Sequence, residues 1–258
     1  MDNGATAQVQ LGDIRGVIDL AADSIQGTIY APWFSNEVNV ECHPWGSPEP
    51  VDMQFDSVLP DGEDTYSCSW AGEWDLQYYQ DVGVGYFGPD GHWVANAFRV
   101  LNPHFTVFPE WEWFDGLDWP DGAVVTTTVE SKPECMVVSV SWGGFFNGNF
   151  GEGCDVVIGD IVTFTDGDTM RTHIVQNLTV TAVDEAADTV AGTADAYAEV
   201  FVWPHATGEQ VLATANDMGV WLADFIGIFD LVPGECGRSE IRDAFGNATA
   251  VDWCVPST

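Results

Sequence analysis

The chain has 258 residues, 46% of them hydrophobic, so it can bury the core of one large β domain or of two to three small ones. Its 41 acidic residues outnumber its 6 basic residues, and the resulting net charge of −35 repels nucleic acid and anionic membrane surfaces but attracts cations. Its apolar runs are too short for a membrane span, so we expect no membrane insertion.

Strand signals run along the chain, and helix signals are almost missing. Apolar residues rarely recur at helical spacing, and 27 glycines and 13 prolines interrupt the sequence. Segments rich in β-branched residues or alternating between polar and apolar residues predict strands at Ala123–Val129, Met136–Trp142, Val156–Thr165 and Arg171–Val183. Asp-Gly pairs between such runs favour tight hairpins. The pattern predicts an all-β fold of sandwich-like modules.

An internal repeat organises the sequence. Asp19–Ile29 reads DLAADSIQGTI and Asp184–Ala194 reads DEAADTVAGTA, with six of eleven positions identical. Further on, Trp74-Asp75-Leu76 matches Phe229-Asp230-Leu231, and the segments GHWV (91–94) and GNAT (246–249) follow at the same separation. We therefore expect two related units with a different β-rich block between them. The predicted modules are residues 1–102, 103–180 and 181–258.

The cysteines favour an oxidising compartment. None forms a CxxC pair, so the usual zinc and thioredoxin spacings are absent, and the even number favours disulfides. Pairing between sequence neighbours is the simplest interpretation, each bridge closing a loop of roughly 20 residues worth about 3 kcal/mol. Free buried thiols are the alternative. The predicted pairs are Cys42 with Cys68, Cys135 with Cys154, and Cys236 with Cys254.

The segment Val190–Asp224 resembles the bacterial immunoglobulin-like repeats of adhesins and surface proteins. It carries a Gly-Thr-Ala opening, a V-x-V strand, a short Gly hairpin and the strand Ala215-Asn-Asp-Met-Gly-Val-Trp221. The resemblance implies tandem immunoglobulin-like β-sandwich modules at a cell surface and no catalytic residues. The N-terminal unit departs from the pattern, because aromatic residues replace the expected small or polar ones. These aromatic residues are Phe34, Trp45, Trp70, Tyr78 and Tyr79.

Nothing in the sequence requires an enzyme. Glu110, Glu112, Asp115 and Asp118 lie among tryptophans, as a glycosidase pair does, but an acidic cluster beside a seam between modules is favoured. The five histidines are scattered, and GxSxG and HExxH motifs are absent.

Calcium is the one cofactor for which the sequence offers candidates, although none is required. Calcium takes six to eight oxygen ligands, and Asp166 with Asp168 and Asp184 with Asp188 place carboxylates densely at turns. Plain solvated turns are the alternative for both pairs.

Twelve tryptophans offer ring surfaces that stack on sugars or fill thin β cores. Trp111, Trp113 and Trp119 lie near Pro, Gly or acidic residues and are the binding candidates. The sequence favours a secreted, non-enzymatic structural or adhesive protein that binds copies of itself or surface glycans. A carbohydrate-binding module of a secreted protein is the alternative.

Overall fold

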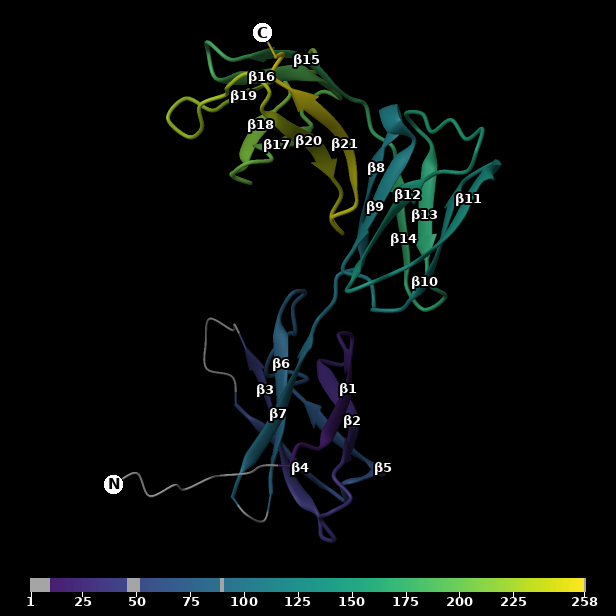
Figure 1. Cartoon of the computed structure of the whole chain (residues 1–258), viewed down its shortest axis with the longest axis vertical. Helices are drawn as coiled ribbons and strands as arrows, with labels where there is room; N and C mark the ends of the chain where they lie inside the picture. Colours follow the sequence, from purple (N-terminus) through teal and green to yellow (C-terminus); the bar gives the residue numbers. More distant parts are fainter. Residues whose placement is uncertain (1–9, 46–51, 89–90, 258) are drawn as a thin grey trace. The chain divides into compact units, whose positions relative to one another are not determined.

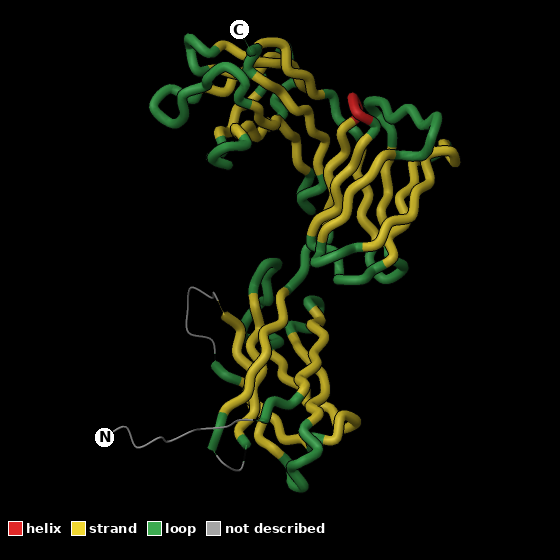
Figure 2. Tube along the Cα trace, viewed as in Figure 1, coloured by secondary structure: helices red, strands yellow, loops and turns green. Residues whose placement is uncertain are grey.

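The computed structural model describes residues 10–45, 52–88 and 91–257, and these residues form 21 β-strands (Figure 2). The helical structure in this part of the chain is one 3-10 turn, Pro109–Trp111, so the described residues contain no helix long and apolar enough to cross a membrane. The chain divides into two compact units, Met1–Leu101 and Asn102–Thr258. The all-β prediction is confirmed.

The first unit is a β-sandwich of a three-stranded sheet, β1-β2-β5, and a four-stranded sheet, β4-β3-β6-β7 (Figure 1). Its core is sealed by Ile25, Tyr66 and Trp70, all fully buried. The Cys42–Cys68 disulfide joins β3 of one sheet to β5 of the other. Its strands are β1 (Asp13–Asp19), β2 (Ser24–Tyr30), β3 (Val38–Trp45), β4 (Gln54–Val58), β5 (Asp61–Ser69), β6 (Asp81–Phe87) and β7 (Trp93–Arg99).

The second unit contains two hydrophobic cores. The first belongs to the middle module, strands β8 to β14, where Phe105 stacks on Phe164 with ring centroids 4.0 Å apart. Its four-stranded sheet has the order β11-β10-β13-β14. The Cys135–Cys154 disulfide ties β11 to the loop after β12. The strands are β8 (His104–Phe108), β9 (Trp113–Leu117), β10 (Val124–Val129), β11 (Lys132–Val140), β12 (Phe145–Asn149), β13 (Ile161–Thr165) and β14 (Met170–Ile174).

The second core belongs to the C-terminal module, strands β15 to β21, and is built around Trp221, Phe225 and Trp253. In β16 inward Val190, Gly192 and Ala194 alternate with half-buried residues, which is the period-two pattern of a strand covered on one face. The three-stranded sheet has the order β15-β16-β19. The strands are β15 (Leu178–Asp184), β16 (Thr189–Ala194), β17 (Glu199–Pro204), β18 (Val211–Thr214), β19 (Val220–Asp224), β20 (Cys236–Arg242) and β21 (Ala248–Cys254).

All six cysteines are paired with their neighbours in sequence, the third bridge being Cys236–Cys254 between the adjacent strands β20 and β21. These are the pairs expected from the spacing. The segment Arg171–Val183 is divided between β14 and β15, which belong to different modules.

One sheet runs through both modules of the second unit. Its seven strands have the order β12-β9-β8-β21-β20-β17-β18, so three strands belong to the middle module and four to the C-terminal module (Figure 1). The two halves meet where β21 pairs with β8 in parallel, with Ala248 opposite Thr106 and Thr249 opposite Val107. A single hydrogen-bonded sheet therefore covers one side of both cores.

The sequence repeat is also a repeat of structure. The β1–β2 hairpin turns at Asp23 and the β15–β16 hairpin at Asp188, both in the left-handed region with φ of 47° and 50°. Each carboxylate accepts a hydrogen bond from a distant backbone N–H, that of Leu76 for Asp23 (2.9 Å) and that of Leu231 for Asp188 (3.0 Å). The two AAD segments thus tie their hairpins to the matching WDL and FDL segments.

Candidate binding site at the module junction

The module junction is the contact between β8 and β21 in the second unit, together with the side chains around it. Small residues line the strand pair: Thr106, Ala248 and Thr249 are at most 5% exposed. Short side chains let two strands from different sandwiches approach to hydrogen-bonding distance, because no large side chain has to fit between the two cores.

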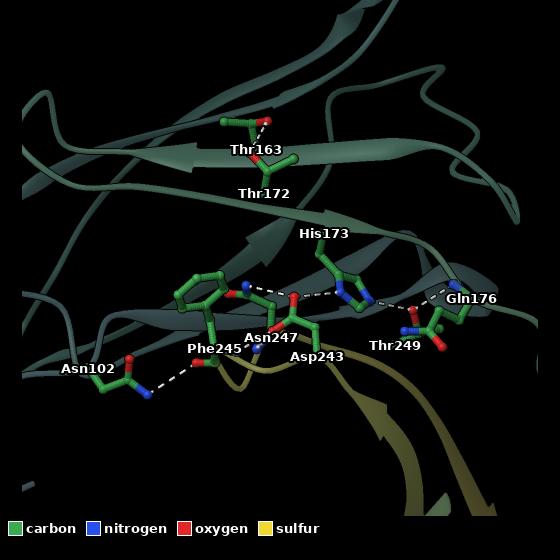
Figure 3. Close-up of polar contacts among 9 residues, drawn as sticks. All are labelled: Asn102, Thr163, Thr172, His173, Gln176, Asp243, Phe245, Asn247 and Thr249. Atoms are coloured by element: carbon green, nitrogen blue, oxygen red, sulfur yellow. Dashed lines mark hydrogen bonds and ion pairs between the residues drawn. The ribbon is translucent and has the colours of Figure 1, made fainter. Parts of the chain in front are cut away.

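A buried histidine connects the two modules (Figure 3). His173 on β14 is 3% exposed, its Nδ1 lies 3.1 Å from Oδ2 of Asp243, and its Nε2 lies 2.9 Å from Oγ1 of Thr249. A carboxylate only accepts, so Nδ1 donates to Asp243. In the neutral ring Nε2 then accepts from the Thr249 hydroxyl, which accepts from the backbone N–H of Gln176 at 2.9 Å. Each described partner in this chain of bonds is satisfied.

Asp243 anchors the loop between β20 and β21. Its carboxylate accepts hydrogen bonds from the backbone N–H of Phe245 and Asn247 and from the Asn247 side chain, at 2.8 to 3.0 Å (Figure 3). Burial alone would raise the pKa of Asp243, but the hydrogen bonds from His173, Asn247 and Phe245 outweigh it and the pKa is lowered. The carboxylate is therefore held in its charged form at the module junction.

An aromatic pocket of about 340 Å³, here called the junction pocket, is lined by residues of both modules. Arg238 is its central charged group: its guanidinium lies 4.4 Å from the centre of the Phe108 ring and its Nε donates to Asp252 at 2.9 Å. It also forms an ion pair with Asp115 at 3.6 Å, and the Trp113 indole donates to the same carboxylate at 2.9 Å. The lining residues are Phe108, Trp111, Trp113, Asn149, Arg238 and Asp252.

The junction pocket offers aromatic and polar groups that suit the recognition of a ligand. Trp111 is 61% exposed and presents a flat ring, while Asn149, Arg238 and Asp252 offer amide, guanidinium and carboxylate groups for hydrogen bonds. A ring beside a few fixed polar groups suits a polyol or a planar ligand.

The structure brings two of the three predicted tryptophans together. Trp111 and Trp113 both line the junction pocket. Trp119, the third binding candidate, is fully buried, so it follows the core-filling alternative and offers no binding surface. Its indole donates to the carbonyl of His104 at 3.0 Å and its ring meets Phe146 edge-on, because the residue folds back over the end of β8 into the core of the middle module.

The four carboxylates of the predicted acidic cluster separate into different roles. Asp115 pairs with Arg238, which lines the junction pocket, and Asp118 accepts a hydrogen bond from the backbone N–H of Asn102. Glu112 ends the 3-10 turn with φ of 49°, and Glu110 lines a neighbouring hollow. Two of the four thus hold parts of the fold in place.

The predicted calcium ligands lie in two different hairpins. Asp166 accepts hydrogen bonds from the N–H groups of Asp168 and Thr169 in the β13–β14 turn. Asp184 does the same for Ala186 and Ala187 in the β15–β16 turn, where Asp188 binds Leu231. Within the described ranges, no three His, Cys, Asp or Glu side chains are grouped to hold a metal ion. Calcium binding at these turns stays a prediction.

Sequence reasoning missed the residues that make the junction, namely His173, Asp243 and Arg238. One signal was present in the sequence. The chain has only 6 basic residues, so each arginine is a candidate for a specific structural or binding role. Four arginines lie over aromatic rings, and one of them defines the junction pocket.

Comparisons with known proteins give likenesses and no family. No protein-family model matches the chain, and no curated protein matches it. Among solved structures, it is similar to a part of a 1.5-MDa bacterial ice-binding adhesin, at 19% identity over 97% of this chain and 100% of that one, with a TM-score of 0.24. A tetra-tandem repeat from the extending region of a large adhesion protein gives 18% identity over 96% and 75%, with a TM-score of 0.25. The BSP domain of a biofilm-associated protein gives 8% identity over 96% and 67%, with a TM-score of 0.26. TM-scores this low carry no argument for a shared family or function.

Proposed function

We propose that this protein is a non-enzymatic, extracellular structural or adhesive protein in which residues 102–258 act as one rigid two-module unit. The observation that carries the proposal is the seven-stranded sheet that passes from one module into the other through β8 and β21. Three disulfides support an oxidising, extracellular setting.

The rigidity follows from what bending would break. Modules in one chain move relative to each other unless their interface is extensive. Here a hinge motion separates β8 from β21 and breaks the bonds of His173 to Asp243 and Thr249. Each such hydrogen bond contributes about 0.5–1.5 kcal/mol net, and all of them would be lost together, so the closed arrangement is favoured.

A structural role also fits how the charged groups of the junction pocket are used. Hydrolysis needs an acid and a base that are free to exchange protons with a substrate. Asp252, which lines the junction pocket, and Asp115, which does not, both bind Arg238, and Asp115 also accepts a hydrogen bond from the Trp113 indole. These groups hold the two modules together, so we expect no turnover of common polysaccharides by the purified chain.

Hydrogen exchange on the full chain tests the rigid unit. We expect the amides that bond across the β8–β21 pairing to exchange as slowly as those of the core strands β13 and β20, because the joint opens only when a module unfolds. Fast exchange of these amides, with slow exchange of the amides that pair β8 with β9 and β21 with β20, would show two independent modules and contradict the proposal.

Carbohydrate binding is the second candidate function, and the junction pocket favours it. The exposed Trp111 ring and the half-buried Trp113 ring lie beside three hydrogen-bonding side chains. Trp111→Ala should abolish retention on a glycan matrix without changing the melting temperature. Trp142→Ala, which removes a tryptophan 86% exposed elsewhere in the middle module, is the matched control. Equal retention of the unchanged chain, of Trp111→Ala and of Trp142→Ala on the glycan matrix contradicts this function.

Self-association and a bacterial surface belong to the same proposal. They are supported by the resemblance of Val190–Asp224 to immunoglobulin-like repeats of bacterial adhesins. Sedimentation velocity across a range of salt concentrations tests the association, because a chain of net charge −35 repels its copies most strongly at low salt. A monomer at every salt and protein concentration contradicts self-assembly.

A further inference from the structure

We propose that the first unit binds an organic monocation, an alkylammonium or guanidinium group, in a pocket where aromatic rings and carboxylates meet. The pocket measures about 670 Å³ and is here called the aromatic–acidic pocket. It collects three of the aromatic residues that break the repeat pattern, Trp45, Tyr78 and Tyr79, and adds Trp74. The other two, Phe34 and Trp70, pack into the core, so the unexplained aromatic residues of this unit divide between core and pocket.

The rings of the pocket are fixed in place by the fold. The Trp45 ring lies so close to Gly83 of β6 that a Cβ on that glycine would meet the ring at 2.8 Å. The Trp74 indole donates to Oε1 of Gln80 at 3.2 Å, and the buried Gln80 also accepts from the backbone of Gln77. Pre-positioned rings lose little conformational entropy when a ligand enters, which favours binding.

The rings also remain open to a ligand. Trp45, Tyr78 and Tyr79 are 43%, 40% and 48% exposed, while Trp74 is partly buried. Solvent therefore reaches three of the four aromatic residues that line the pocket.

The charge of the pocket selects the ligand. Glu73, Asp75 and Asp81 line it, and its described lining residues include no Lys, Arg or His. A cation gains both from the faces of the rings and from the carboxylates, whereas an anion is repelled by both. A neutral sugar would stack on the rings but would gain no charge attraction in return for dehydrating the carboxylates.

The protein shows the same chemistry elsewhere, with the cation supplied from within. In the junction pocket, the Arg238 guanidinium lies on the Phe108 ring between Asp115 and Asp252. Arg242 likewise lies over Phe201, at 4.4 Å. In the first unit Arg99 lies 5.8 Å from the centre of the Tyr79 ring but does not line the pocket. The described lining of the aromatic–acidic pocket supplies no cation of its own, so a cation bound within it would come from a ligand.

Titration of the full chain with tetramethylammonium chloride, at constant ionic strength set by sodium chloride, tests the proposal. The indole N–H signals of Trp45 and Trp74 in a nitrogen–proton correlation spectrum should shift and saturate, and that of Trp111 in the other unit should not. The affinity should fall as sodium chloride is raised. Absence of saturation, or saturation by N-acetylglucosamine but not by tetramethylammonium, overturns the proposal.

Two tryptophans of the same unit provide a matched pair of variants. Trp45 and Trp93 are both exposed and both lie on glycines of β6, Gly83 and Gly85, but only Trp45 lines the pocket. Trp45→Ala should weaken tetramethylammonium binding at least about fivefold. Trp93→Ala should leave it unchanged.

Asp75→Asn keeps the shape of the pocket and removes one charge, and it covers the case in which Trp45→Ala fails to fold. It should lower the affinity for tetramethylammonium by a few fold and make that affinity less sensitive to salt. Unchanged affinity in Asp75→Asn, or equal losses in Trp45→Ala and Trp93→Ala, contradicts a built cation site.

Discussion

The last strands of two equivalent sheets, β7 and β21, have opposite fates. When the two repeats are aligned in sequence, Trp93 of β7 corresponds to Ala248 of β21 and Val94 corresponds to Thr249. The strand orders β4-β3-β6-β7 and β18-β17-β20-β21 also match. β7 ends its described sheet with Trp93 51% exposed, whereas Ala248 and Thr249 are buried where β21 pairs with β8. The joining strand thus carries two small buried side chains where the strand that ends its sheet carries Trp93 and Val94.

The largest expected effect tests what the two units share. Asp188→Ala removes the acceptor for the Leu231 N–H and leaves alanine at a left-handed φ, so it should cost about 3 kcal/mol. Asp23→Ala should cost as much in the first unit, where Leu76 loses its partner. Chemical denaturation followed by segment-resolved hydrogen exchange measures both.

The aspartate-to-asparagine variants at these two positions are the controls. Asparagine tolerates the left-handed region and still offers an acceptor oxygen, so each should retain most of the stability. A loss confined to one of the two units would show that the repeated turn does different work in each.

The next largest effect is expected from Thr249→Val, which gives β21 the residue that β7 carries at the equivalent position, Val94. Valine has the shape of threonine but no hydroxyl, so His173 and the Gln176 N–H each lose a bond in a buried place. We expect a loss of about 2 kcal/mol and faster exchange in β8 and β21, while β17 and β20 stay protected. Val94→Thr should change the first unit by far less, and a larger effect there would contradict the contrast between the two strands.

The pH response should likewise separate the junction from the first unit. The pKa of Asp243 is lowered in the folded protein, from an ordinary value of 3.8, so its contribution to stability is present above that value and is lost as the pH falls below it. We expect β8 and β21 to lose protection on acidification to below about pH 4. Asp243→Asn should flatten this pH dependence at the junction, and an unchanged pH profile in that variant contradicts the assignment.

The smallest expected effect comes from cations in solution. Raising the salt concentration screens the net charge of −35 and should raise the melting temperature by roughly 2 °C in both units. Calcium at matched ionic strength should add a further rise only if it binds Asp166 and Asp168 or Asp184 and Asp188. If calcium raises the melting temperature no further, the predicted calcium sites are wrong, whereas the screening of charge is unaffected by that result.

The sequence was sufficient for the fold class but not for the joint. Period-two alternation, Asp-Gly turns and the AAD repeat are local signals, and each corresponds to local structure. The β8–β21 pairing joins residues about 140 positions apart in the chain through two short contacts, so it leaves no periodic trace in the sequence. In the sequence, His173 looks like any other residue of a strand. Its role is visible only in the structure, where the loop that carries Asp243 lies beside it.

The candidate site was predictable in part for a related reason. Trp111 and Trp119 have similar neighbours in sequence, but one lies on an exposed turn and the other folds into the core, and only the layering of the sheets decides between them. An aspartate at a turn is equally suited to hold its own backbone or a cation. Asp166 and Asp184 bind their own turns in this structure, a choice that composition does not reveal.

The Cys236–Cys254 bridge has a mechanical consequence for the joint. It crosslinks β20 to β21 at the last residue of β21, the strand that also pairs with β8. Tension applied at Val255 would otherwise peel β21 from its neighbours one hydrogen bond at a time, starting from that end. With the crosslink in place, the pull passes directly into β20, and the pairs further along β21 are shielded from unzipping. Under reducing conditions the same pull would begin to open the strand that holds the two modules together.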